Sequence, residues 1–190
     1  MQVRWILALL ALSLGLAASG QAKPACANAT LRLLTFNDRT AHADADADDA
    51  PSGNDWAQRR PLVLALLKEL DPDVVGVQEA TDGQVQELAP GFTVLRQEEV
   101  ALLYRGDRLE ALEGGALKLG EFGFQDSVQD HRGTFHAFKG EGSGGRIDFI
   151  AGRGLKALGS GVHTGSEHIG ERTVYPSDHY PVWAAFQWPR

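Results

Sequence analysis

The chain has 190 residues, of which 43% are hydrophobic and 23% are charged. This composition is ordinary for a soluble globular protein, and the length allows one domain with a sizeable core. The formal net charge of −7 argues against a protein that binds nucleic acid through a broad basic surface. It does not exclude an acidic enzyme that acts on phosphates, because a bound cation would itself supply positive charge.

The N-terminal residues have the pattern of a secretory signal peptide. Arg4 gives a positive start, residues 5–16 are almost entirely apolar, and small residues follow as far as Ala22. The apolar stretch is too short to span a bilayer comfortably. We therefore expect cleavage after Ala22 (or Gly20), a single mature domain over residues 23–190 and a secreted or periplasmic protein without a transmembrane anchor.

Two apolar runs in the first half of the chain predict buried strands with polar ends. Residues 31–36 are followed by the polar Asn37, and residues 73–79 form a continuous apolar run that ends in Glu79. A helix is predicted between the two strands. Polar groups at the carboxyl ends of strands in such a unit are typical of an α/β fold with a site at that edge.

The helix between these strands has clear signals at both ends. Residues 54–55 provide a cap, a wide apolar stripe follows, and Asp71-Pro72 ends the helix. Proline is tolerated only in the first turn, so Pro61 predicts a helix that begins near Arg60.

An acidic loop is expected over residues 39–55. Its tract over residues 43–49 alternates Asp with Ala and cannot bury a core. The spaced Asp residues also allow a calcium-loop hypothesis. However, the sixth position from Asp44 is Asp49 instead of Gly, and the bidentate Glu is missing, so a solvated loop is favoured.

The second half of the chain predicts mainly short strands. A short helix is expected over residues 81–88, and the strands over residues 92–95, 100–105, 109–117, 133–138, 146–150, 155–162 and 182–188. The strands over residues 100–105 and 109–117 are expected to pair across Gly106-Asp107.

Asp148 and the adjacent pair Asp178 and His179 are candidate functional residues in this half. Asp148 interrupts an apolar strand, and a buried carboxylate is costly unless it is paired or bound to a metal. Asp178 and His179 lie between Pro176 and Pro181, which predicts a stiff turn at the start of the last strand. A carboxylate that accepts the far N–H of an imidazole fixes its tautomer and favours its protonated form.

Oxygen ligands at strand ends suggest a metal site. Asn37, Glu79 and Asp178 would supply hard oxygen atoms, which suit Mg²⁺ or Mn²⁺. These ions keep several water ligands and bridge to substrate phosphates.

Four segments in order carry a family resemblance across nearly all of the mature chain. They are Leu33-Leu34-Thr35-Phe36-Asn37, Asp73-Val74-Val75-Gly76-Val77-Gln78-Glu79-Ala80, Gly145-Arg146-Ile147-Asp148-Phe149-Ile150 and Tyr175-Pro176-Ser177-Asp178-His179-Tyr180-Pro181-Val182. In this order the chain resembles the endonuclease/exonuclease/phosphatase superfamily of metal-dependent phosphohydrolases. The resemblance implies an α/β fold, a four-layer α-β-β-α sandwich of two mostly antiparallel sheets.

The resemblance also implies roles for particular residues. Glu79 would be the main metal ligand, with Asn37 beside it in contact with phosphate or a metal-bound water. Asp178 would face the metal, His179 would act on the phosphoryl group, and Asp148 would orient His179. Two arginines, Arg59 and Arg146, are candidates for binding the substrate phosphate.

The implied function is that of an exported, Mg²⁺-assisted phosphohydrolase. It would cleave a phosphodiester or phosphomonoester bond with water as nucleophile. Its substrate would be a phosphate ester such as a lipid headgroup, a nucleotide or a sugar phosphate.

The chain departs from the family pattern in its centre. The family carries a His-x-Asp-type segment and a Gly-Asp-x-Asn segment there, and no Gly-Asp-x-Asn segment is found in this sequence. The departure predicts that a block of central strands and helix is missing. Asp126, Asp130 and His131 are candidates to replace the missing groups, although residues of these types are more often exposed loop residues. The alternative function is therefore a catalytically impaired relative that acts as a binding protein, or an internally deleted gene product.

Overall fold

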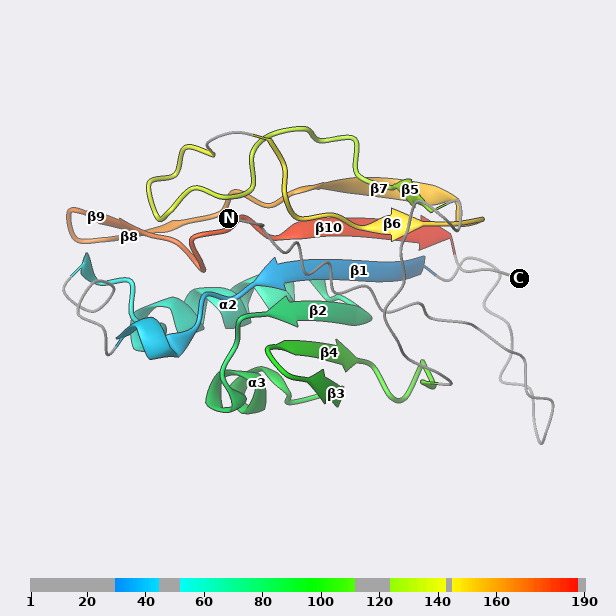
Figure 1. The fold of residues 1–190 in the computed structure, drawn as a ribbon, viewed down its shortest axis with the longest axis horizontal. Coiled ribbons are helices and arrows are strands. Elements are labelled where there is room, and N and C mark those ends of the chain that lie inside the picture. Colours follow the sequence, from blue (N-terminus) through cyan, green and yellow to red (C-terminus); the bar gives the residue numbers. More distant parts are fainter. Residues whose placement is uncertain (1–29, 45–51, 112–123, 143–144, 188–190) are drawn as a thin grey trace, which may run out of the picture.

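The computed structural model describes residues 30–44, 52–111, 124–142 and 145–187, so the expected signal peptide and most of the acidic tract lie outside the described residues. A six-stranded sheet with the order β3-β4-β2-β1-β10-β7 forms the centre of the molecule (Figure 1). Its strands are β1 (Thr30–Asn37), β2 (Val74–Gln78), β3 (Thr93–Gln97), β4 (Val100–Tyr104), β7 (Ala157–Val162) and β10 (Val182–Gln187). Strands β1 and β2 are parallel, and the other neighbours are antiparallel.

Both α-helices in the described ranges are capped, and the sequence predicts the caps of the first. Helix α2 (Trp56–Leu70) begins after Asp55, whose side chain accepts the N–H of Gln58, and ends at Asp71 in the left-handed conformation. Helix α3 (Asp82–Leu88) has a complete capping box between Thr81 and Gln84. A 3-10 helix, η1 (Ala41–Asp44), follows β1. None of the helices in the described ranges is long and apolar enough to cross a membrane.

Each face of the large sheet packs against a separate hydrophobic core. On one face, α2 and α3 bury Val63, Leu67 and Val85 against alternate side chains of β1, β2 and β4. On the other face, Val128 and Ile150 join a second core with the opposite side chains of the sheet. The alternation along β1 divides its side chains between the two cores, as expected for a strand buried on both faces.

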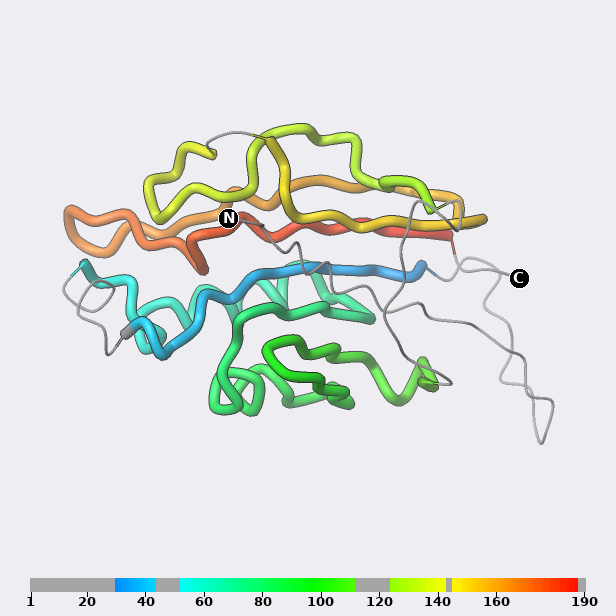
Figure 2. The backbone as a smooth tube through the Cα atoms, viewed as in Figure 1, coloured from blue at the N-terminus to red at the C-terminus, as the bar shows by residue number. Residues whose placement is uncertain are grey.

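The second layer is much less regular than the first. Within the described residues it contains the short pair β5 (Gln125–Asp126) and β6 (Ala151–Gly152), joined by an irregular segment that Figure 2 traces as a smooth tube. Neither α2 nor α3 contributes to its core. The α/β sandwich is confirmed, with helices, a central sheet and a reduced second β layer, while no outer helix covers this second layer in the described ranges.

Several predicted element boundaries are wrong. Helix α2 begins at Trp56 and contains Pro61 in its second turn, because the Asp55 cap fixes the start. Residues 133–138 form only a single bridge at Phe135, and residues 146–150 are not a regular strand. Strand β4 pairs with β2 and β3, and the described residues 109–111 of its expected partner are not a strand. A hairpin of β8 (Glu167–Ile169) and β9 (Arg172–Val174) was not predicted.

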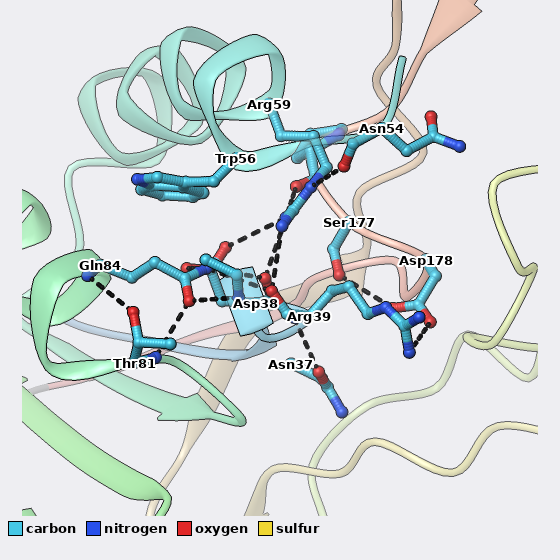
Figure 3. A network of polar contacts seen from close by, with 12 residues as sticks. Asn37, Asp38, Arg39, Asn54, Trp56, Arg59, Thr81, Gln84, Ser177 and Asp178 are labelled. Atoms are coloured by element: carbon cyan, nitrogen blue, oxygen red, sulfur yellow. Dashed lines mark hydrogen bonds and ion pairs between the residues drawn. The ribbon is translucent and has the colours of Figure 1, made fainter. Parts of the chain in front are cut away.

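A fully buried arginine joins helix α2 to two loops at the edge of the sheet. The Arg59 guanidinium donates to the backbone carbonyls of Asn54, Asp38, Arg39 and Pro176 at distances of 2.6–3.1 Å (Figure 3). Because one planar fork satisfies carbonyls from three parts of the chain, it fixes their relative positions.

The carboxyl group beside Arg59 is also buried. Asp38 Oδ1 lies 3.9 Å from Arg59 Nη1, and Asp38 Oδ2 accepts from Gln84 Nε2 at 3.2 Å. Burial raises the pKa of Asp38 well above its usual value, although the Arg59 charge and the Gln84 hydrogen bond act in the opposite direction. Gln84 also donates to the Arg39 carbonyl, so α3 holds the same loop from the other side.

An aromatic stack supports the turn that carries Asp178 and His179. The ring of His136 stacks on Tyr180 with centroids 4.0 Å apart, and Tyr175 packs against the same imidazole at 4.8 Å. The backbone N–H of His136 donates to the backbone carbonyl of Asp178 at 2.9 Å. Burial, followed by the charge of His179, lowers the pKa of His136 to about 4.

We predict that Arg59→Met destabilises the fold by about 3–5 kcal/mol, because it leaves buried carbonyls without their donor. Arg59→Lys should recover only part of this loss, since an ammonium lacks the planar fork. Urea denaturation measures both values. The matched control is Arg60→Met. Arg60 is half-exposed and paired with Glu87, so its loss should cost no more than about 1 kcal/mol. Equal costs at the two positions would contradict the structural role of Arg59.

We predict that His136→Phe reduces the acid sensitivity of the fold. The unfolded chain takes up a proton near pH 6.5, whereas folded His136 does so only near pH 4. This histidine therefore costs stability as pH falls from 6.5 to 4, on the order of 2 kcal/mol in all. Between pH 7.5 and pH 4.5 the variant should lose less stability than the wild type. The exposed His168 is the control position, and His168→Phe should leave the pH dependence unchanged.

Candidate functional site

The register of the sheet brings the polar strand ends to one edge. Parallel pairing places Asn37 opposite Gln78, so the chain leaves β1 and β2 at the same level. Antiparallel pairing places Val182 opposite Thr35, so the turn before β10 reaches this edge as well. The expected meeting of the first, second and last strands is therefore a direct result of backbone pairing.

Glu79 and Asn37 form one half of the site. Asn37 Nδ2 donates to Glu79 Oε1 at 2.8 Å, and Asn37 Oδ1 accepts the backbone N–H of Arg39 at 3.0 Å. Glu79 adopts a left-handed backbone with φ of 61°, and its own N–H donates to the Glu99 carbonyl. Such a conformation is uncommon for a residue other than Gly and is often found at functional sites. It ends the strand and leaves Glu79 exposed.

His179 and Asp148 form the other half. His179 Nδ1 lies 2.9 Å from Asp148 Oδ2, and both side chains are largely buried. Burial lowers the pKa of His179, but the Asp148 hydrogen bond and charge outweigh it, with help from Asp178 and Glu79. The net pKa of His179 therefore lies above its usual value. The Nδ1 contact directs Nε2 away from Asp148.

Asp148 is held in place without a regular strand. Thr134 Oγ1 accepts the N–H groups of both Ile147 and Asp148, and Arg146 Nη1 donates to the Asp148 carbonyl at 3.0 Å. Thr134 also accepts the N–H of Tyr180 through its carbonyl. Asp148 and the turn carrying His179 are thus fastened to the same residue.

Asp178 lies between the two halves. Its Oδ1 accepts from Ser177 Oγ at 3.1 Å, and its Oδ2 lies 4.0 Å from Arg39 Nη1. Burial raises the pKa of Asp178, and the negative charge of Glu79 adds to this effect, while His179, Arg39 and Ser177 oppose it.

The electrostatics join the two halves into one site. The Glu79 charge raises the pKa of both Asp178 and His179, so the three groups lie within range of one another. Two like charges close together favour a cation between them. Among the described residues, no group of three or more His, Cys, Asp or Glu is arranged around a metal position. Glu79 and Asp178 are the two carboxylates that could hold a cation here, and Mg²⁺ is usually held by one or two carboxylates together with water and substrate phosphate.

The two arginines expected to bind substrate are buried instead. The Arg59 guanidinium donates to backbone carbonyls, as described above, and its side chain is inaccessible to solvent. Arg146 pairs with the Asp126 carboxylate and donates to the carbonyls of Val128 and Asp148. Arg59 satisfies its donors within the protein, whereas the buried Nε of Arg146 has no hydrogen-bond partner among the described residues. The substrate contact expected of both arginines stays a prediction.

The residues considered as replacements for the missing central groups have structural partners. Asp126 pairs with Arg146 and accepts the N–H of Val128, and Asp130 pairs with Arg132. His131 is exposed. Asp130 and His131 are therefore loop residues as expected, whereas Asp126 is an exposed residue of strand β5.

Three contributors to the site were missed from the sequence. Arg39 reaches Asp178, Ser177 donates to the same carboxylate, and Thr134 fixes Asp148. Arg39 follows the polar end of β1 by two positions, which was an available signal. The part played by Thr134 depends on long-range packing and has no local signal.

Comparison with known proteins finds the fold and no close sequence relative. No family model matches the chain, and no curated protein matches it. An endonuclease/exonuclease/phosphatase family protein from Bacteroides thetaiotaomicron superposes with a TM-score of 0.67 at 16% identity, over 86% of this chain and 99% of that chain. The mannosyl-6-phosphatase Bt3783 from Bacteroides thetaiotaomicron VPI-5482 gives a TM-score of 0.68 at 18% identity, over 83% of this chain and 100% of that chain.

A third match comes from an animal protein. D. rerio TDP2 complexed with a single strand DNA product gives a TM-score of 0.55 at 11% identity, over 85% of this chain and 100% of that chain. At these identities the likeness establishes the fold. The resemblance predicted from the four motifs is confirmed at this level: the chain has the fold of endonuclease/exonuclease/phosphatase family proteins.

Proposed function

We propose that this protein is an exported metal-dependent phosphohydrolase that cleaves a phosphodiester or phosphomonoester bond with water as nucleophile. The observation that carries the proposal is the meeting of two pairs at one sheet edge. The Asn37–Glu79 pair is joined at 2.8 Å and the Asp148–His179 pair at 2.9 Å, and the Glu79 charge acts on His179. A carboxylate site beside an oriented imidazole suits phosphoryl chemistry.

A divalent cation would complete the charge balance of the site. Glu79 and Asp178 would hold it, because both offer hard carboxylate oxygens and the burial of Asp178 favours a compensating positive charge. Mg²⁺ or Mn²⁺ in this position would supply the positive charge that stabilises a reacting phosphate. Asn37 would keep the Glu79 carboxylate in one orientation through its amide hydrogen bond.

His179 would act on the phosphate through Nε2. Asp148 holds Nδ1 and favours the protonated ring, so Nε2 carries a proton that it can give to a leaving oxygen or share with a phosphate oxygen. Phe135 packs edge-on against the imidazole with centroids 5.1 Å apart and limits its rotation. Asp148 and Phe135 thus hold the imidazole of His179 in place, and positioning of this kind is how proteins accelerate phosphoryl transfer.

The substrate class is a phosphate ester. Matched structures include a protein described as a mannosyl-6-phosphatase and one complexed with a single strand DNA product, which supports a phosphate-ester substrate. The acidic balance of the chain favours a small substrate such as a nucleotide, sugar phosphate or lipid headgroup. Export follows from the N-terminal signal pattern.

A second candidate is a binding protein with the same fold and little catalysis. The sequence lacks the Gly-Asp-x-Asn segment, and Asp126 and Asp130 are paired with arginines. A group that positions water contributes about 10²–10⁴-fold to a rate, so its loss would leave a slow enzyme or none.

We predict that Glu79→Gln and His179→Ala each lower Mg²⁺-dependent hydrolysis by at least about 100-fold, because each removes a group that acts on the phosphate. The assay is the release of p-nitrophenol from p-nitrophenyl phosphate and from bis-p-nitrophenyl phosphate. Matched controls are Glu171→Gln and His168→Ala, which change exposed residues of the β8–β9 hairpin region and should retain full activity.

The same assay separates the two candidate functions. A wild-type rate equal to that of both site variants would reject the enzyme and favour the binding protein. A wild-type rate that does not fall when EDTA removes divalent cations would reject metal dependence.

We also predict that Asp148→Asn lowers kcat by about 10²-fold or more with little change in KM, since the amide leaves the imidazole without its carboxylate partner. Asp148→Glu should recover part of kcat. Steady-state kinetics with p-nitrophenyl phosphate provides both constants, and melting curves show whether the fold is retained. An Asn variant with wild-type kcat would show that Asp148 does not orient His179 for chemistry.

A further inference from the structure

An arginine that the sequence analysis did not select lies at the open side of the site. Arg39 follows Asn37 by two residues, and its guanidinium extends toward the Asp178 carboxylate (Figure 3). The distance from Arg39 Nη1 to Asp178 Oδ2 is 4.0 Å, and 32% of the Arg39 side chain is exposed. It therefore combines access to solvent with contact to the site, unlike the buried Arg59 and Arg146.

The backbone of Arg39 is fixed more firmly than that of an ordinary loop residue. Its N–H donates to Asn37 Oδ1, and its carbonyl accepts from both Arg59 Nη2 and Gln84 Nε2 at 3.0 and 3.1 Å. Its φ of 46° lies in the left-handed region. This rare conformation is stabilised from three sides, and it sets the direction in which the side chain leaves the backbone.

Arg39 is a positive group among the carboxylates of the site. Glu79, Asp178 and Asp148 place three carboxylates at the site, and an anionic substrate approaching them meets repulsion. A guanidinium beside them offsets that repulsion and presents paired N–H donors, which match the non-bridging oxygens of a phosphate. The 4.0 Å ion pair with Asp178 is partly exposed, and such a pair contributes little to stability.

From these observations we infer that Arg39 binds the non-bridging oxygens of the substrate's phosphate group. The inference rests on the proposed function, since it assigns the phosphate contact of the same site. It replaces Arg59 and Arg146 in that role. Arg39 would receive the phosphate on the Asp178 side, while His179 faces the leaving oxygen.

The test uses Arg39→Gln and Arg39→Lys in the full chain. Gln retains much of the stem without the charge, and Lys retains the charge without the planar fork. Hydrolysis of p-nitrophenyl phosphate gives kcat and KM, and inhibition by inorganic phosphate gives Ki. We expect Arg39→Gln to raise both KM and Ki by about 10- to 100-fold, as for the loss of a charge-assisted pair. Arg39→Lys should show a smaller rise.

A second measurement keeps the inference independent of catalysis. Isothermal titration calorimetry with inorganic phosphate in Mg²⁺ buffer measures binding directly, and Arg39→Gln should weaken it by a similar factor. Arg60→Gln is the matched control on the exposed face of α2, and it should change neither KM nor phosphate affinity. Melting curves of each variant exclude unfolding as the cause, and Arg39→Lys provides a second variant if Arg39→Gln does not fold.

The outcomes distinguish this inference from the proposed function. Hydrolysis by the wild type with unchanged KM, Ki and phosphate affinity in Arg39→Gln would overturn the role of Arg39 and leave the enzyme proposal standing. Phosphate binding that depends on Arg39 in a protein without hydrolysis would support Arg39 and reject the enzyme. A wild type that neither hydrolyses the substrate nor binds phosphate would overturn both.

Discussion

The arrangement of the site depends on one buried guanidinium. Arg59 donates to carbonyls on both sides of the sheet edge, from the loop after β1 and from the turn before β10. Other hydrogen bonds hold each loop separately, but Arg59 donates to both of them and so fixes one relative to the other. The cost of burying a charged group is thus offset by hydrogen bonds that fix both loops, and Pro176 lies 117 residues from Arg59 along the chain.

The two faces of the sheet support the residues of the site in different ways. Helices α2 and α3 form a complete core on one face and also provide Arg59 and Gln84, which fix the loop carrying Arg39. The opposite face is covered by a mostly irregular segment, whose polar contacts hold Asp148. The half of the site formed by Asn37 and Glu79 therefore rests on regular structure, and the half formed by Asp148 and His179 rests on an irregular segment.

Sequence patterns predicted the regular parts of the fold well. Strand ends at Asn37 and Glu79 follow from apolar runs that stop at polar residues, and the cap at Asp55 follows from local chemistry. The residues around Asp148 were predicted as a strand because Ile147 and Phe149 alternate with polar neighbours. The backbone there is irregular, since its N–H groups bond to the Thr134 side chain instead of a neighbouring strand. Such long-range partners have no local sequence signal, and the same limit explains why the buried contacts of Arg59 were not predicted.

The hydrogen bonds from Thr134 and Arg146 that hold Asp148 have a consequence for how the protein would lose activity on heating. Its segment has few regular backbone hydrogen bonds, and proteins open locally first where such bonds are few. Release of the Thr134 and Arg146 contacts would leave the imidazole without its orienting carboxylate while the six-stranded sheet remained folded. Thermal inactivation would then begin below the temperature at which the sheet melts, and cooling would restore the paired imidazole without any need to refold the core.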